Sequence, residues 1–141
     1  MKILEILTKQ RQTGNIGEKI AVKALKKDGY KILKTNYVAL GSEIDIIAEN
    51  KTTVTFVEVK TRTVGSQNPW EARPASAVTP RKQRKIIDAA KYYLTAYNKE
   101  KRVSLDIIEV YLNQDGKKSK VIHIKNAFNR NSANERGYKR K

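Results

Sequence analysis

The chain has 141 residues, a length that fits one domain, and about 24% of them are leucine, isoleucine, valine or phenylalanine, enough for a folded core. The absence of cysteine and the single histidine exclude disulfides, a cysteine nucleophile and the usual structural zinc sites. Lysine and arginine number 30 against 14 acidic residues, and the net charge of +16 predicts a polyanionic partner.

The first predicted element is an amphipathic helix over residues 13–27. Apolar residues recur there at helical spacing, with Thr13 as a candidate N-cap and Gly29 just past the end. Three strands are predicted next, at residues 30–38, 43–50 and 53–62. With Asn50 and Lys51 as the turn between them, the last two strands form a hairpin.

The second half of the chain contains one more helix and two more strands. A loop with Gly65, Pro69 and Pro74 precedes a helix that begins near Pro80 and ends at about Tyr97. The strands are predicted at residues 103–112 and 120–126. The order α-β-β-β-α-β-β predicts an α/β fold, with one mixed sheet flanked by helices.

The positive charge belongs to the predicted domain as well as to its C-terminal end. Residues 129–141 carry five cations and one anion, which leaves +12 for residues 1–128. The last segment lacks an apolar period, so we predict a domain over residues 1–128 and a disordered basic tail over 129–141. No apolar run is long enough to cross a membrane and no secretory segment is evident, so a cytoplasmic protein is expected.

Acidic residues inside the apolar hairpin strands are the main chemical signal. Buried carboxylates are costly unless they are paired or bind a cation. The predicted turn sets Asp45 opposite Phe56 and Glu43 opposite Glu58, and strand alternation places these acids on one face with Lys60. Mg²⁺ fits such a cluster because it binds through one or two carboxylates, waters and substrate phosphates. An ordinary half-exposed strand shows the same alternation, so a solvated strand face is the alternative.

Two helical features extend this signal. Glu18 lies at the margin of the apolar face of the first helix, where it faces either the acidic cluster or a neighbouring lysine. The second helix begins with cations around Gln83, which suits a phosphate backbone, although a solvated helix face is the alternative. The predicted nucleic-acid-binding cations are Arg62, Arg81, Lys82, Arg84 and Lys85.

Six blocks in fixed order resemble a known family. They span residues 14–128 and read GNIGEKIAVKAL, GSEIDIIA, FVEVKTR, PRKQRKIIDAAKYYL, LDIIEV and IHIKNAF. This set resembles the bacterial YraN-like family of proposed endonucleases. That family is similar to archaeal Holliday-junction resolvases and belongs to the PD-(D/E)XK nuclease-like group, so the resemblance implies a restriction-endonuclease-like core.

The resemblance assigns roles to the hairpin residues. Asp45 matches the first metal-binding carboxylate, Glu58 the second, and Lys60 the lysine of the Glu-x-Lys element. Asp45 and Glu58, with the backbone carbonyl of Val59 between Glu58 and Lys60, are expected to hold one Mg²⁺ or Mn²⁺. Lys60 is then expected to orient or deprotonate the attacking water.

The resemblance also covers both helices. Glu18 matches a helical glutamate that is expected to contribute to metal binding, and Gln83 matches a polar catalytic residue on the second helix. Ser42 stands where glycine is common, and Leu105 where phenylalanine is common. Both differences lie away from the expected ligands.

The function implied is a Mg²⁺- or Mn²⁺-dependent endonuclease that acts on DNA, with branched or junction DNA among its expected substrates. The alternative is a nucleic-acid-binding protein that keeps the nuclease fold without cleaving. RNA remains open as a partner under both readings. A homodimer, the form of junction resolvases, is one expected oligomeric state.

Overall fold

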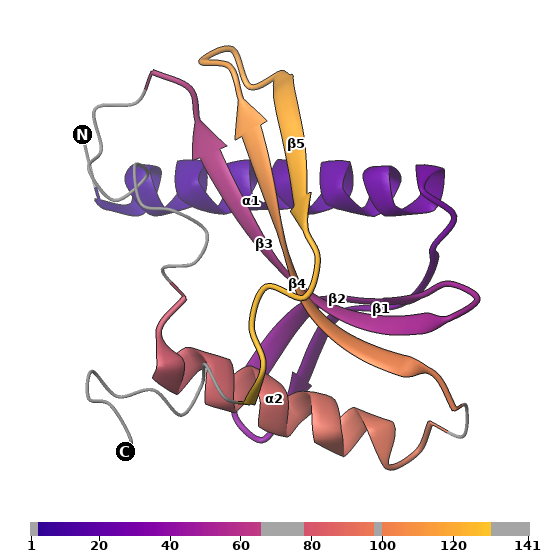
Figure 1. Cartoon of the computed structure of the whole chain (residues 1–141). Coiled ribbons are helices and arrows are strands. Elements are labelled where there is room, and N and C mark those ends of the chain that lie inside the picture. The colour runs from indigo at the N-terminus through magenta and orange to yellow at the C-terminus, as the bar shows by residue number, and fades with distance from the viewer. Residues whose placement is uncertain (1–2, 66–77, 98–99, 131–141) are drawn as a thin grey trace, which may run out of the picture.

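Two helices cover opposite faces of a five-stranded sheet (Figure 1). The structure is a computed structural model that describes residues 3–65, 78–97 and 100–130. Its strand order is β1-β2-β3-β4-β5, in which β3 and β4 are parallel and the other neighbours antiparallel. The elements are α1 (Ile3–Lys27), β1 (Lys31–Ala39), β2 (Ser42–Glu49), β3 (Thr53–Thr63), α2 (Pro80–Leu94), β4 (Arg102–Leu112) and β5 (Lys118–Ile124). The predicted α/β fold is confirmed, and this arrangement is consistent with a nuclease-like core.

Helix α1 is longer than predicted at its N-terminus. It begins at Ile3, so Thr13 lies inside the helix and the prediction of an N-cap there is wrong. The residues before Thr13 include leucine, lysine, glutamine and arginine, which favour helix without a strong apolar period. The helix ends as predicted: Gly29 has φ +89°, and the Tyr30 N–H donates to the Leu25 carbonyl at 3.0 Å, as in a Schellman motif.

Helix α2 begins as predicted and ends earlier. The Thr79 side chain accepts a hydrogen bond from the Lys82 N–H at 3.2 Å, and Pro80 occupies the first turn. The helix ends at Leu94 with Thr95 as its C-cap, and the N–H groups of Ala96 and Tyr97 donate only to the carbonyls three residues earlier, as in turns. Helix α2 thus starts at a fixed point, which matters because its first turn lines the candidate site.

The β2–β3 hairpin has a different register from the predicted one. The Asn50 side chain accepts hydrogen bonds from the N–H groups of Thr52 and Thr53, at 3.0 and 2.9 Å. This side-chain cap moves the tip of the turn to residues 51–52, and Phe56 pairs with Ile47. The prediction that Phe56 lies opposite Asp45 is therefore wrong, and so is the pairing of Glu43 with Glu58.

Each face of the sheet carries its own hydrophobic core. The core under α1 includes Ala21, Leu25, Ile46, Val57 and Ile108, and the core under α2 includes Ile44, Phe56, Ile86, Ala90 and Ile107. A Cβ atom on Gly17 would lie 1.9 Å from the Thr61 Oγ1 atom, so α1 approaches β3 at a point that only glycine allows.

Parts of the predicted organisation lie outside the described residues. These are Pro69 and Pro74 of the predicted loop and residues 131–141 of the predicted tail. Among the helices that the structure describes, none has the length and apolar character that crossing a membrane requires.

Candidate active site

The candidate site lies where β2 and β3 stop pairing. The ladder between these strands runs from Glu49 opposite Val54 to Ile46 opposite Val57, and the next residues are Asp45 and Glu58. There the Asp45 Oδ2 atom accepts a hydrogen bond from the Val59 N–H at 2.8 Å. The Asp45 side chain thus accepts the hydrogen bond that a backbone carbonyl of β2 would otherwise accept from Val59. As a result, the carboxylates of Asp45 and Glu58 lie at the same level of the sheet.

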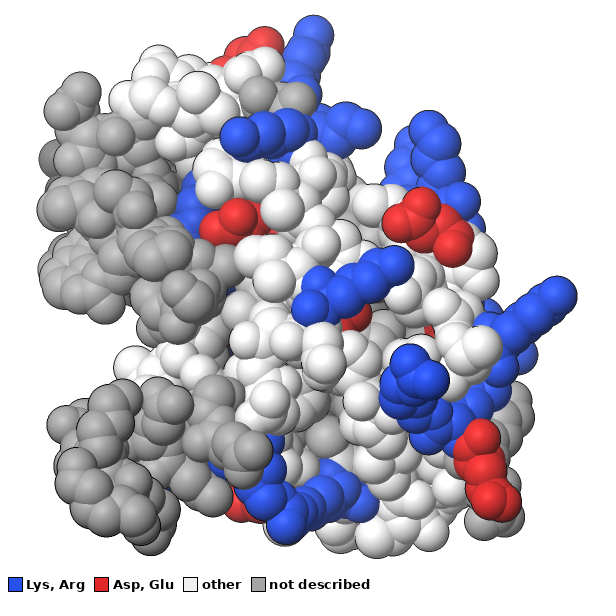
Figure 2. Space-filling view, viewed as in Figure 1, with Lys and Arg blue, Asp and Glu red and all other residues white. Residues whose placement is uncertain are grey.

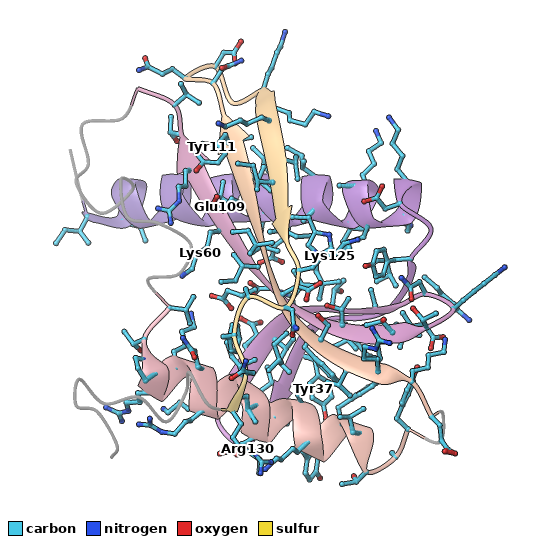
Figure 3. All side chains as sticks on the ribbon, viewed as in Figure 1. Tyr37, Lys60, Glu109, Tyr111, Lys125 and Arg130 are labelled. Atoms are coloured by element: carbon cyan, nitrogen blue, oxygen red, sulfur yellow. The ribbon has the colours of Figure 1, made fainter. Side chains whose placement is uncertain are left out.

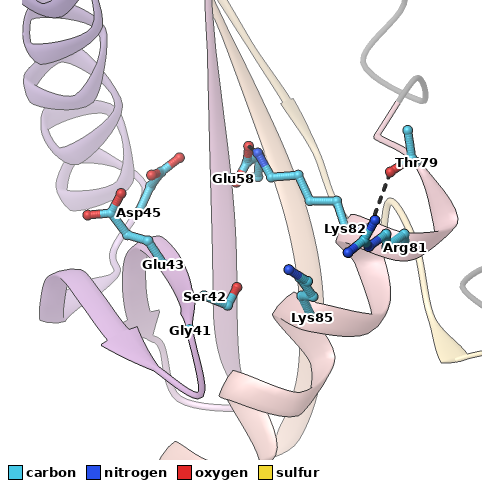
Figure 4. A pocket seen from close by; sticks show the side chains of 9 residues that line it. All are labelled: Gly41, Ser42, Glu43, Asp45, Glu58, Thr79, Arg81, Lys82 and Lys85. Atoms are coloured by element: carbon cyan, nitrogen blue, oxygen red, sulfur yellow. Dashed lines mark hydrogen bonds and ion pairs between the residues drawn. The ribbon is translucent and has the colours of Figure 1, made fainter.

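This fork opens into a cavity of about 390 Å³ between the sheet and the start of α2 (Figure 4). Its acidic wall comes from β2 and β3, and its basic wall from the first turns of α2. The lining residues are Gly41, Ser42, Glu43, Asp45, Glu58, Thr79, Arg81, Lys82 and Lys85. Carboxylates and cations therefore face each other across one open space.

Glu58 is buried and doubly paired. Its side chain is 8% exposed, and its Oε2 atom lies 2.8 Å from Lys82 Nζ and 3.6 Å from Lys60 Nζ. Burial alone would lower the pKa of Lys82, but the hydrogen bond to Glu58 and the charge of that carboxylate hold it above its ordinary value. Two ammonium groups thus offset the cost of a buried charge.

The charges that raise the pKa of Asp45 are those of other carboxylates, although the charge of Asp45 in turn helps to raise the pKa of Lys82. Burial, the charge of Glu58 and the more distant charges of Glu18 and Glu43 raise the pKa of Asp45 to about 7, against the lowering effect of the Val59 N–H. A carboxyl group among other carboxyl groups favours either a proton or a cation.

The donor set fits a divalent cation of the Mg²⁺ type. Mg²⁺ needs only one or two protein carboxylates, because waters and substrate phosphates complete its coordination. Asp45 and Glu58 supply two, joined through the backbone of Val59. Within the described part of the chain, no group of three or more His, Cys, Asp or Glu side chains is close enough to form a fully protein-built site. A metal here would therefore depend on water and substrate.

Glu18 and Gln83 do not line the cavity. The Glu18 carboxylate accepts a hydrogen bond from Asn36 Nδ2 at 3.0 Å, and its charge still contributes to the raised pKa of Asp45. Gln83 is buried, and its Nε2 atom donates to the Val78 carbonyl at 2.8 Å. Gln83 therefore fixes the chain that leads into α2.

Three of the five predicted phosphate-binding cations line the cavity, and two do not. Arg81, Lys82 and Lys85 are exposed on α2 and line the cavity. Arg84 is on the same helix but does not line the cavity. Arg62 is buried on β3, with its Nε atom 3.5 Å from Glu109 Oε2. Figure 3 shows Glu109 on β4 beside Lys60 on β3, and the two residues are partners in the parallel ladder.

Two parts of the site were not predicted from sequence. One is the ion pair of Lys82 with Glu58, which joins residues from separate elements and leaves no local signal. The other is the β1–β2 turn, where Gly41 and Ser42 form one edge of the cavity. The Leu40-Gly41 pair between two apolar stretches was a usable turn signal.

Comparison with known proteins identifies similar sequences. A family model described as "Uncharacterised protein family UPF0102" matches residues 17–110, a span that contains both walls of the cavity. A UPF0102 protein of Caldanaerobacter subterraneus subsp. tengcongensis is 46% identical over 121 residues, which cover 84% of this chain and 96% of the relative. A UPF0102 protein of Chlorobium phaeobacteroides is 42% identical over 120 residues, covering 82% and 92%. Neither relative's name states an activity.

Proposed function

The chain belongs to the uncharacterised protein family UPF0102, and we propose that it is a divalent-metal-dependent endonuclease that hydrolyses phosphodiester bonds in DNA. The observation that carries this proposal is the pair of carboxylates, Asp45 and Glu58, at a strand fork that faces a cationic helix start. An acidic wall suits a metal ion, and a basic wall suits the phosphates that surround a scissile bond.

The carboxylates, Lys60 and the cations of α2 have different roles in the proposed hydrolysis. Asp45 and Glu58 would hold a divalent cation, which would stabilise the charge that grows on the phosphoryl oxygens. The Lys60 ammonium group, 3.6 Å from Glu58, orients the attacking water and favours its deprotonation. Lys82 exchanges Glu58 for a substrate phosphate, and Arg81 and Lys85 hold the neighbouring phosphates.

One observation favours the non-catalytic alternative. Glu58 is already neutralised by Lys60 and Lys82, so the buried carboxylate has partners without a metal. Under this alternative the basic wall binds a nucleic-acid backbone and the acidic wall only anchors α2.

A cleavage assay separates the two functions. Branched, duplex and single-stranded DNA and RNA are incubated with the full chain in EDTA, Mg²⁺ or Mn²⁺. We expect metal-dependent cleavage of DNA that Lys60→Ala lowers by at least about 100-fold, with DNA affinity within a few-fold of wild type. Lys51→Ala, at the exposed tip of the β2–β3 turn, is the matched control and should cleave normally. Binding without cleavage in any metal, or full cleavage by Lys60→Ala, contradicts the nuclease proposal.

A further inference from the structure

Two large apolar side chains are exposed at the end of β1 and in the β1–β2 turn, next in sequence to residues that line the cavity. Val38 is 67% exposed and Leu40 is 66% exposed, whereas the next residues, Gly41 and Ser42, line the cavity. Figure 4 shows this turn facing the start of α2. Ala39 is buried in the core under α2. The exposed pair is therefore carried by an anchored hairpin.

The backbone of this turn makes leucine an unfavourable choice. Ala39 pairs with Ser42, and the two residues between them have positive φ angles, +53° for Leu40 and +73° for Gly41. A two-residue turn with both φ angles positive is the type I′ hairpin, which favours asparagine followed by glycine. A bulky residue with positive φ is an outlier, and such strain tends to occur at functional positions.

We propose that Val38 and Leu40 form an apolar wedge that packs against the face of a DNA base displaced from its stack. This rests on the proposed function, because the DNA is held by the cations across the cavity, Arg81, Lys82 and Lys85. Nucleobases have large apolar faces, and proteins use leucine and similar side chains as wedges at base steps. Apolar side chains that contact bases, together with cations that contact phosphates, are the combination used to bind a nucleic-acid strand.

The net charge of +16 supports DNA over a protein partner for this wedge. The three cations beside it would oppose the approach of a second copy of the same basic surface. Gly41 and Ser42, which directly follow Leu40, line the same cavity as the three cations, so the proposal requires one strand to contact the wedge and the basic wall together.

The test measures binding in EDTA, where cleavage does not occur. Two duplexes of the same sequence are used, one fully paired and one with a single bulged 2-aminopurine whose fluorescence rises when it leaves the stack. We expect wild type to prefer the bulged duplex and to raise its fluorescence. Leu40→Asn should lower this preference by about tenfold and remove the fluorescence rise, with little effect on the paired duplex.

Leu40→Asn removes the apolar side chain without straining the backbone, because asparagine is favoured at the first position of a type I′ turn. We expect its melting temperature to equal or exceed that of wild type, so lost binding cannot result from unfolding. Val38→Thr should also weaken the preference. Val103→Thr is the matched control: Val103 is 44% exposed at the start of β4, paired with Val54 at the other end of β3 from the cavity.

Two outcomes overturn the wedge. One is unchanged preference and fluorescence in both wedge variants. The other is a wild-type protein that dimerises through the β1–β2 turn. In that case Leu40→Asn would be monomeric and would keep the wild-type preference for the bulged duplex. The nuclease proposal fails separately, in the cleavage assay with Mn²⁺, whatever the result in EDTA.

Discussion

Asp45 and Glu58 are neighbouring carboxylates with opposite surroundings. Glu58 has two ammonium groups within 3.6 Å, whereas other carboxylates and burial dominate the environment of Asp45. Neutralising each side chain should therefore change the stability of the metal-free protein in opposite directions. This contrast separates a cation site from a purely structural cluster.

We expect Asp45→Asn to stabilise the metal-free protein above pH 7. The pKa of Asp45 is raised from 3.8 to about 7, so between about pH 4 and pH 7 the folded state keeps a proton that the unfolded chain has released. Wild-type stability should fall as the pH rises through this window. The variant lacks this loss, so it should match wild type near pH 4 and exceed it by about 1–3 kcal/mol at pH 8. Urea unfolding in EDTA at several pH values measures the difference.

Glu58→Gln is the companion variant for this experiment. It removes the partner of Lys60 and Lys82, whose side chains are 31% and 49% exposed, so we expect a loss of only about 1 kcal/mol. An Asp45→Asn protein that is less stable than wild type at pH 8 would mean that the carboxylate has a cationic partner.

We expect Lys82→Met to tighten Mn²⁺ binding. The Lys82 ammonium group lies 2.8 Å from Glu58 Oε2 and competes with any cation for that oxygen. Methionine keeps the apolar stem without the charge, and the dissociation constant measured by calorimetry should fall by about tenfold. Lys85→Met removes the same charge from the same cavity wall and serves as the control. An equal change in both variants would show only a general electrostatic effect.

At the scale of elements, the sequence predicted those helix ends that are determined by capping residues next to them in the chain. The α2 start at Thr79-Pro80 and the end of α1 at Gly29 depend on caps that the sequence displays. The β2–β3 register was missed because it depends on the Asn50 side chain, which caps the turn and moves its tip.

The candidate site was predictable only in part, because some of its contacts lie within one hairpin and others join distant elements. Asp45, Glu58 and Lys60 share one hairpin, so alternation predicted that they gather on one face. The pairing of Glu58 with Lys82 depends on where α2 packs after a long connection. That is a tertiary contact, which a pattern within one element cannot reveal.

The contact between α1 and β3 gives a prediction with an internal control. Gly17→Ala places a Cβ atom 1.9 Å from Thr61 Oγ1, so the Thr61 side chain or α1 itself must shift. We expect a loss of about 1–3 kcal/mol. Gly14→Ala, in the same helix with open space around it, should instead stabilise the protein by about 0.5–1 kcal/mol. Thermal unfolding of both variants tests this, and equal effects would contradict the close approach.

At the scale of the whole molecule, the positive charge is widely distributed. Figure 2 shows lysine and arginine side chains over the described parts of one face rather than in a single patch. Binding to DNA should accordingly depend strongly on salt and little on sequence, since phosphate contacts dominate.

Deleting residues 129–141 should weaken this salt dependence without abolishing it. The segment carries five cations and one anion, and residues 1–128 retain +12. Each neutralised phosphate contributes about 0.9 to the slope of log affinity against log salt on duplex DNA. Fluorescence anisotropy at several salt concentrations measures the slope for both proteins. A truncated protein without salt-dependent affinity would assign binding to the tail alone.

The parallel pairing of β3 with β4 has a consequence for the folding pathway. Strands β1, β2 and β3 pair with their sequence neighbours, whereas Thr53 must find Arg102 across the connection that includes α2. Contacts between distant residues form slowly because closing a long loop costs chain entropy. Strands β1, β2 and β3 are synthesised before α2, so Asp45 and Glu58 can come together in the β1–β2–β3 sheet before Lys82 of α2 packs against them. A nascent chain therefore passes through a stage in which Lys60, on the same strand, is the partner of Glu58, and the closer ammonium group of Lys82 has not yet arrived.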